Sequence, residues 1–188
     1  MKTKWKVWLF LLSIFLLSET PKALALTQEA LVIKVSISAA VSFTVDKSTW
    51  NFGAMAADST SVSTAPIVVS NNSGGLSQTY RLQFSTPTVS PAGWLPGASW
   101  NTTTAETFVL GAQFSTAQPA NADGSWGSDI VTTSLQSASS TVFGNTVAGE
   151  SGQTVPNAED RSLWFRIETP ATTADPSSHD IYVTLSVQ

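Results

Sequence analysis

The stretch VSTAPIVVSNNSGGLSQTYRLQFS, residues 62–85, shows the clearest strand pattern in this chain. Its second half alternates as a strand with one buried face does, with Tyr80, Leu82 and Phe84 on one face and Thr79, Arg81 and Gln83 on the other. Residues 71–75, Asn-Asn-Ser-Gly-Gly, predict a turn because asparagine and glycine tolerate positive φ. We therefore expect the segments 62–70 and 78–85 to pair as a β-hairpin, with Pro66 marking a sheet edge or a bulge.

The same period-two alternation recurs along the chain, and no segment keeps a helical period. Further strands are expected at 31–37, 41–45, 106–114, 129–136, 162–168 and 180–187, with long loops at 86–104 and 115–128. Half-polar strands fit antiparallel sheets that have one solvated face. We therefore predict an all-β fold, a single antiparallel β-sandwich of immunoglobulin-like or jelly-roll type with about eight strands. Alternation alone does not separate a sandwich from a closed barrel.

Two short segments resemble a known kind of module. Thr-Trp-Asn-Phe-Gly at 49–53, followed by Ile-Val-Val-Ser-Asn-Asn-Ser-Gly-Gly at 67–75, is similar to the start of immunoglobulin-like modules in bacterial surface proteins. The resemblance implies a β-sandwich used for adhesion or assembly rather than for catalysis. The absence of cysteine argues against the disulfide-bearing subunits of chaperone–usher pili.

The first 25 residues have the pattern of a secretory signal peptide. Three lysines lie within residues 1–6, residues 7–17 are apolar except for Ser13, and Ala23-Leu24-Ala25 follows a polar break. A retained membrane anchor is the alternative, but the apolar run is shorter than the ~20 residues that a spanning helix needs. We expect cleavage after residue 25, a single domain at 26–188, no membrane span after cleavage, and a secreted or cell-surface location.

The composition narrows the classes of partner. Loss of residues 1–25 removes four lysines and one glutamate, which leaves five basic and twelve acidic residues and a net charge of −7. Such a surface repels phosphate backbones and lacks the basic cluster that binds anionic lipid, so we expect neither nucleic acid nor a membrane surface as a partner. The chain has no cysteine, which excludes a thiol nucleophile and a Cys-ligated metal.

The residues that carry most enzyme chemistry are sparse. His179 is the one histidine, and the flanking Ser178 and Asp180 make no triad because neighbouring strand residues point to opposite faces. A glycosidase needs two carboxylates across a cleft. No spacing selects such a pair among Glu106, Asp123, Asp129, Glu150, Glu159 and Asp160. We expect no enzyme activity, and a carboxylate-dependent hydrolase is the enzymatic alternative.

One loop partly matches a calcium-binding pattern. Asn121, Asp123, Ser125 and Asp129 supply oxygens at positions one, three, five and nine of a calcium loop. The glycine of position six is replaced by Trp126, and the glutamate of position twelve by Thr132. A solvated, turn-rich loop is therefore the favoured interpretation; no cofactor is expected, and calcium at these four residues is the alternative.

Three tryptophans lie in loops rich in Gly, Pro, Ser and Asn, namely Trp94, Trp100 and Trp126. Aromatic faces on loops at one end of a sandwich often hold a sugar ring or a partner side chain. The alternative, which we favour, is that each tryptophan anchors its own loop against the core. Trp164 and Arg166 share one face of the segment 162–168, and the guanidinium is in position to stack on that indole.

These observations leave three functional hypotheses. The first is an exported structural or adhesive surface protein that assembles with copies of itself or with other surface proteins, in which a terminal segment such as 31–37 pairs with a neighbouring molecule. The second is a carbohydrate-binding module that uses Trp94, Trp100 and Trp126. The third is an enzyme, the least supported of the three.

Overall fold

The computed structural model describes residues 29–38, 42–101, 104–144, 150–175 and 177–188. This part of the chain contains eleven strands and one short 3₁₀ helix. Their bounds are β1 Glu29–Ser38, β2 Phe43–Val45, β3 Thr49–Met55, β4 Thr60–Val62, β5 Ile67–Asn71, β6 Tyr80–Ser90, β7 Leu95–Pro96, β8 Thr107–Phe114, η1 Asp123–Ser125, β9 Gln136–Ser137, β10 Asp160–Glu168 and β11 His179–Val187. No helix in these residues has the length and apolarity needed to cross a bilayer.

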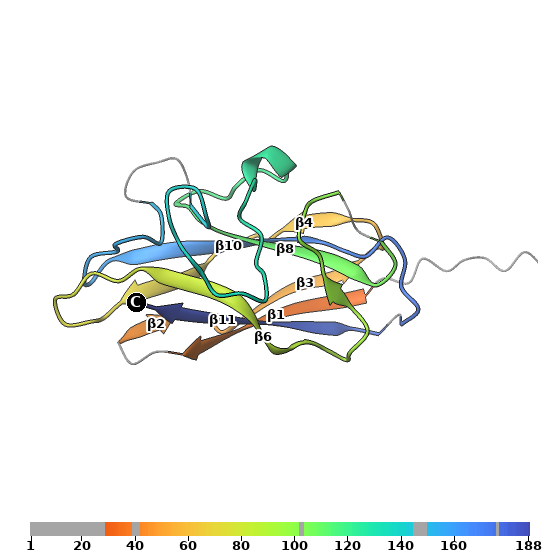
Figure 1. Ribbon diagram of the computed structural model, residues 1–188, viewed down its shortest axis with the longest axis horizontal. Coiled ribbons are helices and arrows are strands. Elements are labelled where there is room, and N and C mark those ends of the chain that lie inside the picture. Colours follow the sequence, from red (N-terminus) through yellow and green to blue (C-terminus); the bar gives the residue numbers. More distant parts are fainter. Residues whose placement is uncertain (1–28, 39–41, 102–103, 145–149, 176) are drawn as a thin grey trace, which may run out of the picture.

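The strands form two sheets that pack face to face (Figure 1). The first sheet has the order β3-β1-β11-β6-β9, and the second has the order β2-β5-β10-β8-β7 with β4 paired to β10. The all-β sandwich predicted from the alternation is therefore confirmed. The strand number is higher than the eight expected, because several strands have only two or three residues and leave little periodic signal.

The core lies between the two sheets. Leu31, Ile33 and Val35 of β1 are at most 4% exposed, and alternate residues of β11 and β6 face the same interior. The second sheet contributes Phe108, Leu110, Ala112, Phe114, Leu163, Phe165 and Ile167. Full burial of each large apolar side chain stabilises the fold by about 1.5–3 kcal/mol.

Strand β1 occupies an interior position in its sheet. It runs antiparallel to β3 and parallel to β11, so the first described strand lies beside the last one. Its register joins Leu31 to His179 at one end and Ser38 to Ser186 at the other. The one parallel ladder of this sheet connects the two ends of the described chain, so the sandwich is not purely antiparallel as we predicted.

The expected hairpin between 62–70 and 78–85 is wrong, because β5 and β6 belong to different sheets. The turn itself exists, with positive φ at Gly74 and Gly75, but it carries the chain from one sheet to the other. The buried Asn71 holds this crossing: its Nδ2 donates to the carbonyls of Leu76 and Val155, each at 2.9 Å. Two strands that cover one core from opposite sides show the same alternation as two paired strands.

Pro66 marks an interruption, as expected. Strands β4 and β5 both pair with β10, and residues 63–66 separate them. The gap is bridged by Ser63, whose Oγ accepts a hydrogen bond from the amide of Phe165 at 3.1 Å and whose own amide donates to the Phe165 carbonyl at 2.8 Å. Proline has no N–H to donate to a neighbouring strand, and at a break between two strands no ladder hydrogen bond is lost.

The strand expected at 129–136 is mostly absent. Only an isolated bridge of Ile130 to Gly111 and the short β9 replace it. The segment leaves the second sheet, where the Val131 amide donates to Leu110, and reaches the first sheet, where the Ala138 amide donates to Tyr80. It closes one side of the sandwich, so it cannot pair continuously with either sheet.

The predicted loop at 86–104 begins later than expected because β6 continues to Ser90. Its register with β11 shifts between Ile181 and Val183, which are opposite Val89 and Phe84. The extra residues on β6 form a bulge, and a bulge breaks the alternation that marks a strand in the sequence.

Candidate functional site

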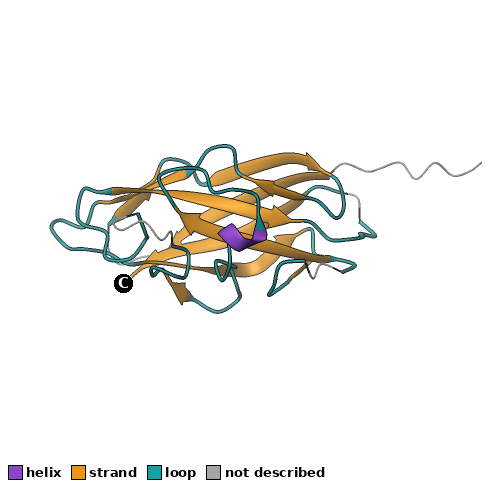
Figure 2. Cartoon of the chain, turned by 90° about the horizontal axis from the view of Figure 1, so that it is seen from above, coloured by secondary structure: helices purple, strands orange, loops and turns teal. Residues whose placement is uncertain are grey.

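The outer face of the second sheet is covered by the loop that follows β8. Strands β8 and β10 are buried on both faces, whereas a sandwich strand ordinarily exposes one. Figures 1 and 2 show the segment that contains η1 standing over this face. The outward residues of the two strands therefore form a second, smaller interior.

A glycine makes room for two indole rings in this second interior. A Cβ built on Gly111 of β8 would lie 2.8 Å from Cζ2 of Trp100 and 3.1 Å from Cε3 of Trp126. Both tryptophans, with Val62 and Trp164, form an apolar cluster separate from the main core. A glycine inside a strand often marks such a close approach.

Two tryptophans of this outer cluster, Trp126 and Trp164, are held by hydrogen bonds. Trp126 is 0% exposed, and its Nε1 donates to the carbonyl of Ala120 at 2.8 Å. Trp164 donates in the same way to the carbonyl of Ser115 at 2.8 Å. Trp126 therefore anchors its loop, and its ring offers no free face to a ligand.

Trp100 is partly exposed, and the guanidinium of Arg166 lies against its ring. The guanidinium carbon of Arg166 is 4.1 Å from the centroid of the Trp100 ring, a cation–π distance. Arg166 itself is 2% exposed, and its Nε donates to Oδ1 of Asn121 at 3.0 Å. We predicted stacking of Arg166 on Trp164, whereas the guanidinium lies against Trp100, which comes from a distant loop.

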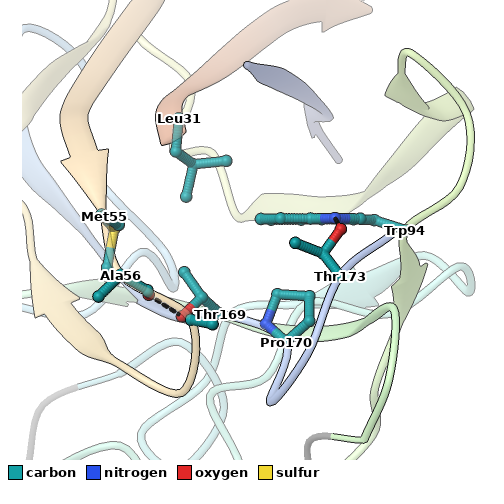
Figure 3. A pocket seen from close by; sticks show the side chains of 8 residues that line it. Leu31, Met55, Ala56, Trp94, Thr169, Pro170 and Thr173 are labelled. Atoms are coloured by element: carbon teal, nitrogen blue, oxygen red, sulfur yellow. Dashed lines mark hydrogen bonds between the residues drawn. The ribbon is translucent and has the colours of Figure 1, made fainter. Parts of the chain in front are cut away.

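Trp94 lies apart from the other two loop tryptophans, at one end of the main core. Its Nε1 donates to Oγ1 of Thr173 at 3.2 Å, and its ring stacks on that of His179 with the centroids 4.3 Å apart. Beside it, Leu31, Met55 and Pro170 line a small pocket (Figure 3). About 20 Å³ of free space holds one water molecule and no sugar ring.

His179 is buried and packs against protein groups. It is 1% exposed, and its Nδ1 is 3.2 Å from the carbonyl oxygen of Pro91. Its neighbour Asp180 instead forms an ion pair with Lys34 at 2.5 Å. In the described part of the chain, no group of three or more His, Cys, Asp or Glu side chains is placed to hold a metal ion.

Two residues of the calcium pattern, Asn121 and Asp129, have side-chain oxygens that accept hydrogen bonds within the protein. Asn121 accepts from Arg166, and Asp129 is buried with Oδ2 2.7 Å from the donating Nε2 of Gln113. The carbonyl of Ser125 accepts from the same Gln113 amide at 2.9 Å. Asp123 begins η1, and its side chain lies outside the described set. Calcium at these four residues stays the untested alternative to a solvated loop without a cofactor.

Asp129 at this site has a markedly shifted pKa. Burial raises the pKa of Asp129 to about 6, while hydrogen bonds from Gln113 and from the backbone of Phe143 and Gly144 oppose the rise. A carboxyl group with this pKa changes charge close to neutral pH.

Two pockets flank the segment Gly127–Ser128. The first, of about 550 Å³, is lined by the loop residues around Trp126, with Gln113 and Asp129 among them. The second, of about 290 Å³, is lined by Trp100, Ile130, Thr132 and Gln136. Gly127 and Ser128 line both, and we call the two together the loop groove. Of the three loop tryptophans, Trp100 and Trp126 meet at this groove and Trp94 does not.

Several residues at the groove have no distinguishing signal in the sequence. Gln113 and Gln136 are ordinary strand amides without a motif, and nothing in the sequence singles them out. Gly111 did leave a signal, since it is a glycine within the alternating segment 106–114. No known protein-family model matches this chain, and no curated protein matches it either.

Proposed function

We propose that the mature chain, residues 26–188, is an exported, non-catalytic structural or adhesive protein that acts through self-assembly or contacts with other surface proteins. An immunoglobulin-like or jelly-roll type of sandwich is part of this proposal. The two packed sheets support this proposal. The resemblance of residues 49–75 to surface modules supports it too, and these residues contain β3, β4 and β5.

The main observation behind this proposal is the interior position of β1 in its sheet. This strand fills the space between β3 and β11 with hydrogen bonds on both sides. The next strand along the chain, β2, belongs to the other sheet. All ladder partners of β1 are therefore separated from it by at least one intervening strand.

Removal of β1 would leave a groove that has to be filled. The backbone of β3 and β11 would lose its partners, and the core would lose Leu31, Ile33 and Val35. Either the chain's own β1 or that of a second copy satisfies this groove with the same contacts. Unpaired strand edges recruit such a strand readily. Exchange of β1 between copies is our proposed mode of assembly.

Cysteine cross-linking tests this exchange, because the natural chain has no cysteine. Oγ of Ser36 on β1 is 3.3 Å from Oγ1 of Thr184 on β11. We would mix the single variants Ser36→Cys and Thr184→Cys of the 26–188 chain, oxidise them over a concentration series, and measure covalent dimers by mass spectrometry. Exchange predicts heterodimers joined through positions 36 and 184.

A matched pair of cysteines controls for random collision. Oγ of Ser85 on β6 is 2.8 Å from Oγ1 of Thr184, and neither strand is exchanged in our proposal. A mixture of Ser85→Cys and Thr184→Cys should therefore give no heterodimer, whereas the double variant should close within one chain. If the 36/184 mixture gives no more dimer than this control, and light scattering shows a monomer at every concentration, self-assembly through β1 is wrong.

A further inference from the structure

The loop groove is a pocket on the outside of the sandwich, and no residue of β1 lines it. Its larger part lies over the second sheet, and its smaller part reaches Gln136 of β9, the edge strand of the first sheet. Its larger part falls within the range of about 300–1,000 Å³ that is usual for small-molecule sites, and its smaller part is close to the lower limit.

The lining of the groove carries many uncharged polar groups in its larger part and is mainly apolar in its smaller part. Hydroxyl groups come from Ser115, Ser125, Ser128, Ser140, Thr132 and Thr141, and side-chain amides from Gln113, Gln118 and Gln136. Hydroxyls both donate and accept, so this set matches a ligand that carries many hydroxyl groups of its own.

The charge of the groove excludes acidic ligands. Asp129 is its one charged lining residue among those described, and neither pocket is lined by lysine or arginine. An anionic ligand would meet this carboxylate and the net negative charge of the mature chain, while the nearby guanidinium of Arg166 is buried against Trp100 and does not line the groove. A neutral ligand meets no such repulsion.

Trp100 adds the apolar surface that a sugar ring needs. Its partly exposed indole lines the smaller pocket beside Thr132 and Gln136, whose side chains are 3.1 Å apart. An aromatic surface next to polar side chains packs against the C–H face of a pyranose while the hydroxyl groups find partners. Trp94 and Trp126 are buried and cannot stack on a sugar ring, so Trp100 is the loop tryptophan that remains for carbohydrate binding.

We infer that the loop groove binds a neutral oligosaccharide, which contacts Trp100 in the smaller pocket and reaches the Gln113 side of the larger one across Gly127–Ser128. The exposed Ser128 lines both pockets, so it is the position at which a bulky side chain blocks both. Its hydroxyl makes one exposed hydrogen bond, to the carbonyl of Thr141, whose loss leaves the core unchanged.

The test starts with the 26–188 chain on a printed array of neutral and acidic oligosaccharides. The neutral oligosaccharide with the strongest signal is then titrated by calorimetry into the wild-type chain and into Ser128→Trp. We expect binding to neutral members of the array and a loss of affinity of at least tenfold in Ser128→Trp. Gln136→Ala, which removes a lining amide without adding bulk, should weaken the same binding severalfold.

Ser77→Trp is the matched control. It places the same indole on an exposed serine in the turn between β5 and β6, outside the groove, and should leave affinity unchanged. Circular dichroism checks that each variant is folded. Binding to no neutral oligosaccharide, binding to acidic ones only, or equal affinity in Ser128→Trp and wild type would overturn the inference. None of these outcomes depends on the cross-linking result, so the two proposals fail separately.

Discussion

Gly111 of β8 lies directly beneath the indole of Trp100, so close that a Cβ at position 111 would be 2.8 Å from Cζ2 of that ring. The outer cluster and the loop groove both depend on this approach. A strand residue with any side chain would lift Trp100 away from the sheet, and with it one wall of the groove.

Gly111→Ala should therefore destabilise the protein although alanine suits a strand better than glycine does. Overpacking of this kind costs about 1–3 kcal/mol in the free energy of unfolding. Urea unfolding followed by circular dichroism measures this cost, and the emission maximum of tryptophan reports whether Trp100 has moved. Gly124→Ala is the control, because a Cβ there meets no atom within 4 Å. Equal stability of the two variants would contradict the close contact.

Trp126 should behave as a loop anchor. Because it is fully buried, Trp126→Ala is expected to cost about 3–5 kcal/mol in the free energy of unfolding. Trp126→Phe keeps most of the apolar volume but loses the hydrogen bond to Ala120, which is worth ~1 kcal/mol. Trp100→Ala, at a partly exposed position, should cost less than Trp126→Ala. Chemical denaturation of the three variants gives the order, and the reverse order would refute the anchor role.

The stability of the protein should include a contribution from Asp129 that falls as pH rises. Burial raises the pKa of Asp129 to about 6 in the folded state, above the 3.8 of an ordinary aspartate. Between these values the folded state binds more protons than the unfolded state, so the free energy of unfolding decreases from about pH 4 to about pH 6 and then levels off for this group.

Asp129→Asn tests this linkage through the slope of stability against pH rather than through absolute stability. The substitution removes the titration, so the fall between pH 4 and pH 6 should be smaller than in wild type. Asp58→Asn, which removes a carboxylate from an exposed position, is the matched control for the loss of one charge. Identical slopes for wild type and Asp129→Asn would show that Asp129 titrates as an ordinary carboxyl group.

The N-terminal segment predicts a defined mature end. Expressed with its own leader in a host that exports proteins, the chain should be recovered with Leu26 as its first residue, since Ala23 and Ala25 provide the small side chains that signal peptidase needs. Intact-mass measurement of the exported protein checks this directly. Replacing Ala25 by a bulky residue, Ala25→Trp, should block processing. Recovery of a chain that still begins at Met1 would instead favour a membrane anchor.

Local pattern was enough to find most of the strands. The alternation at 31–37 and 180–187 marks β1 and β11 to within a few residues, because the side chains of a half-buried strand must alternate wherever it lies. The segments 106–114 and 162–168 mark β8 and β10 in the same way, but their burial on both faces was not predicted. Alternation failed at 129–136, which crosses between the sheets, and at the end of β6, where a bulge breaks it.

The sequence by itself determined that this is a β protein in which most strands have one solvated and one buried face. The alternation of polar and apolar residues that shows this is a property of each segment alone. Only the tertiary structure decided which strands pair, that 62–70 and 78–85 face each other across the core, and that β1 lies beside β11. It also decided that Trp126 is buried while Trp100 lines a pocket. The physical reason is that pairing and burial depend on contacts between residues far apart in the chain, and such contacts leave no periodic trace in either partner.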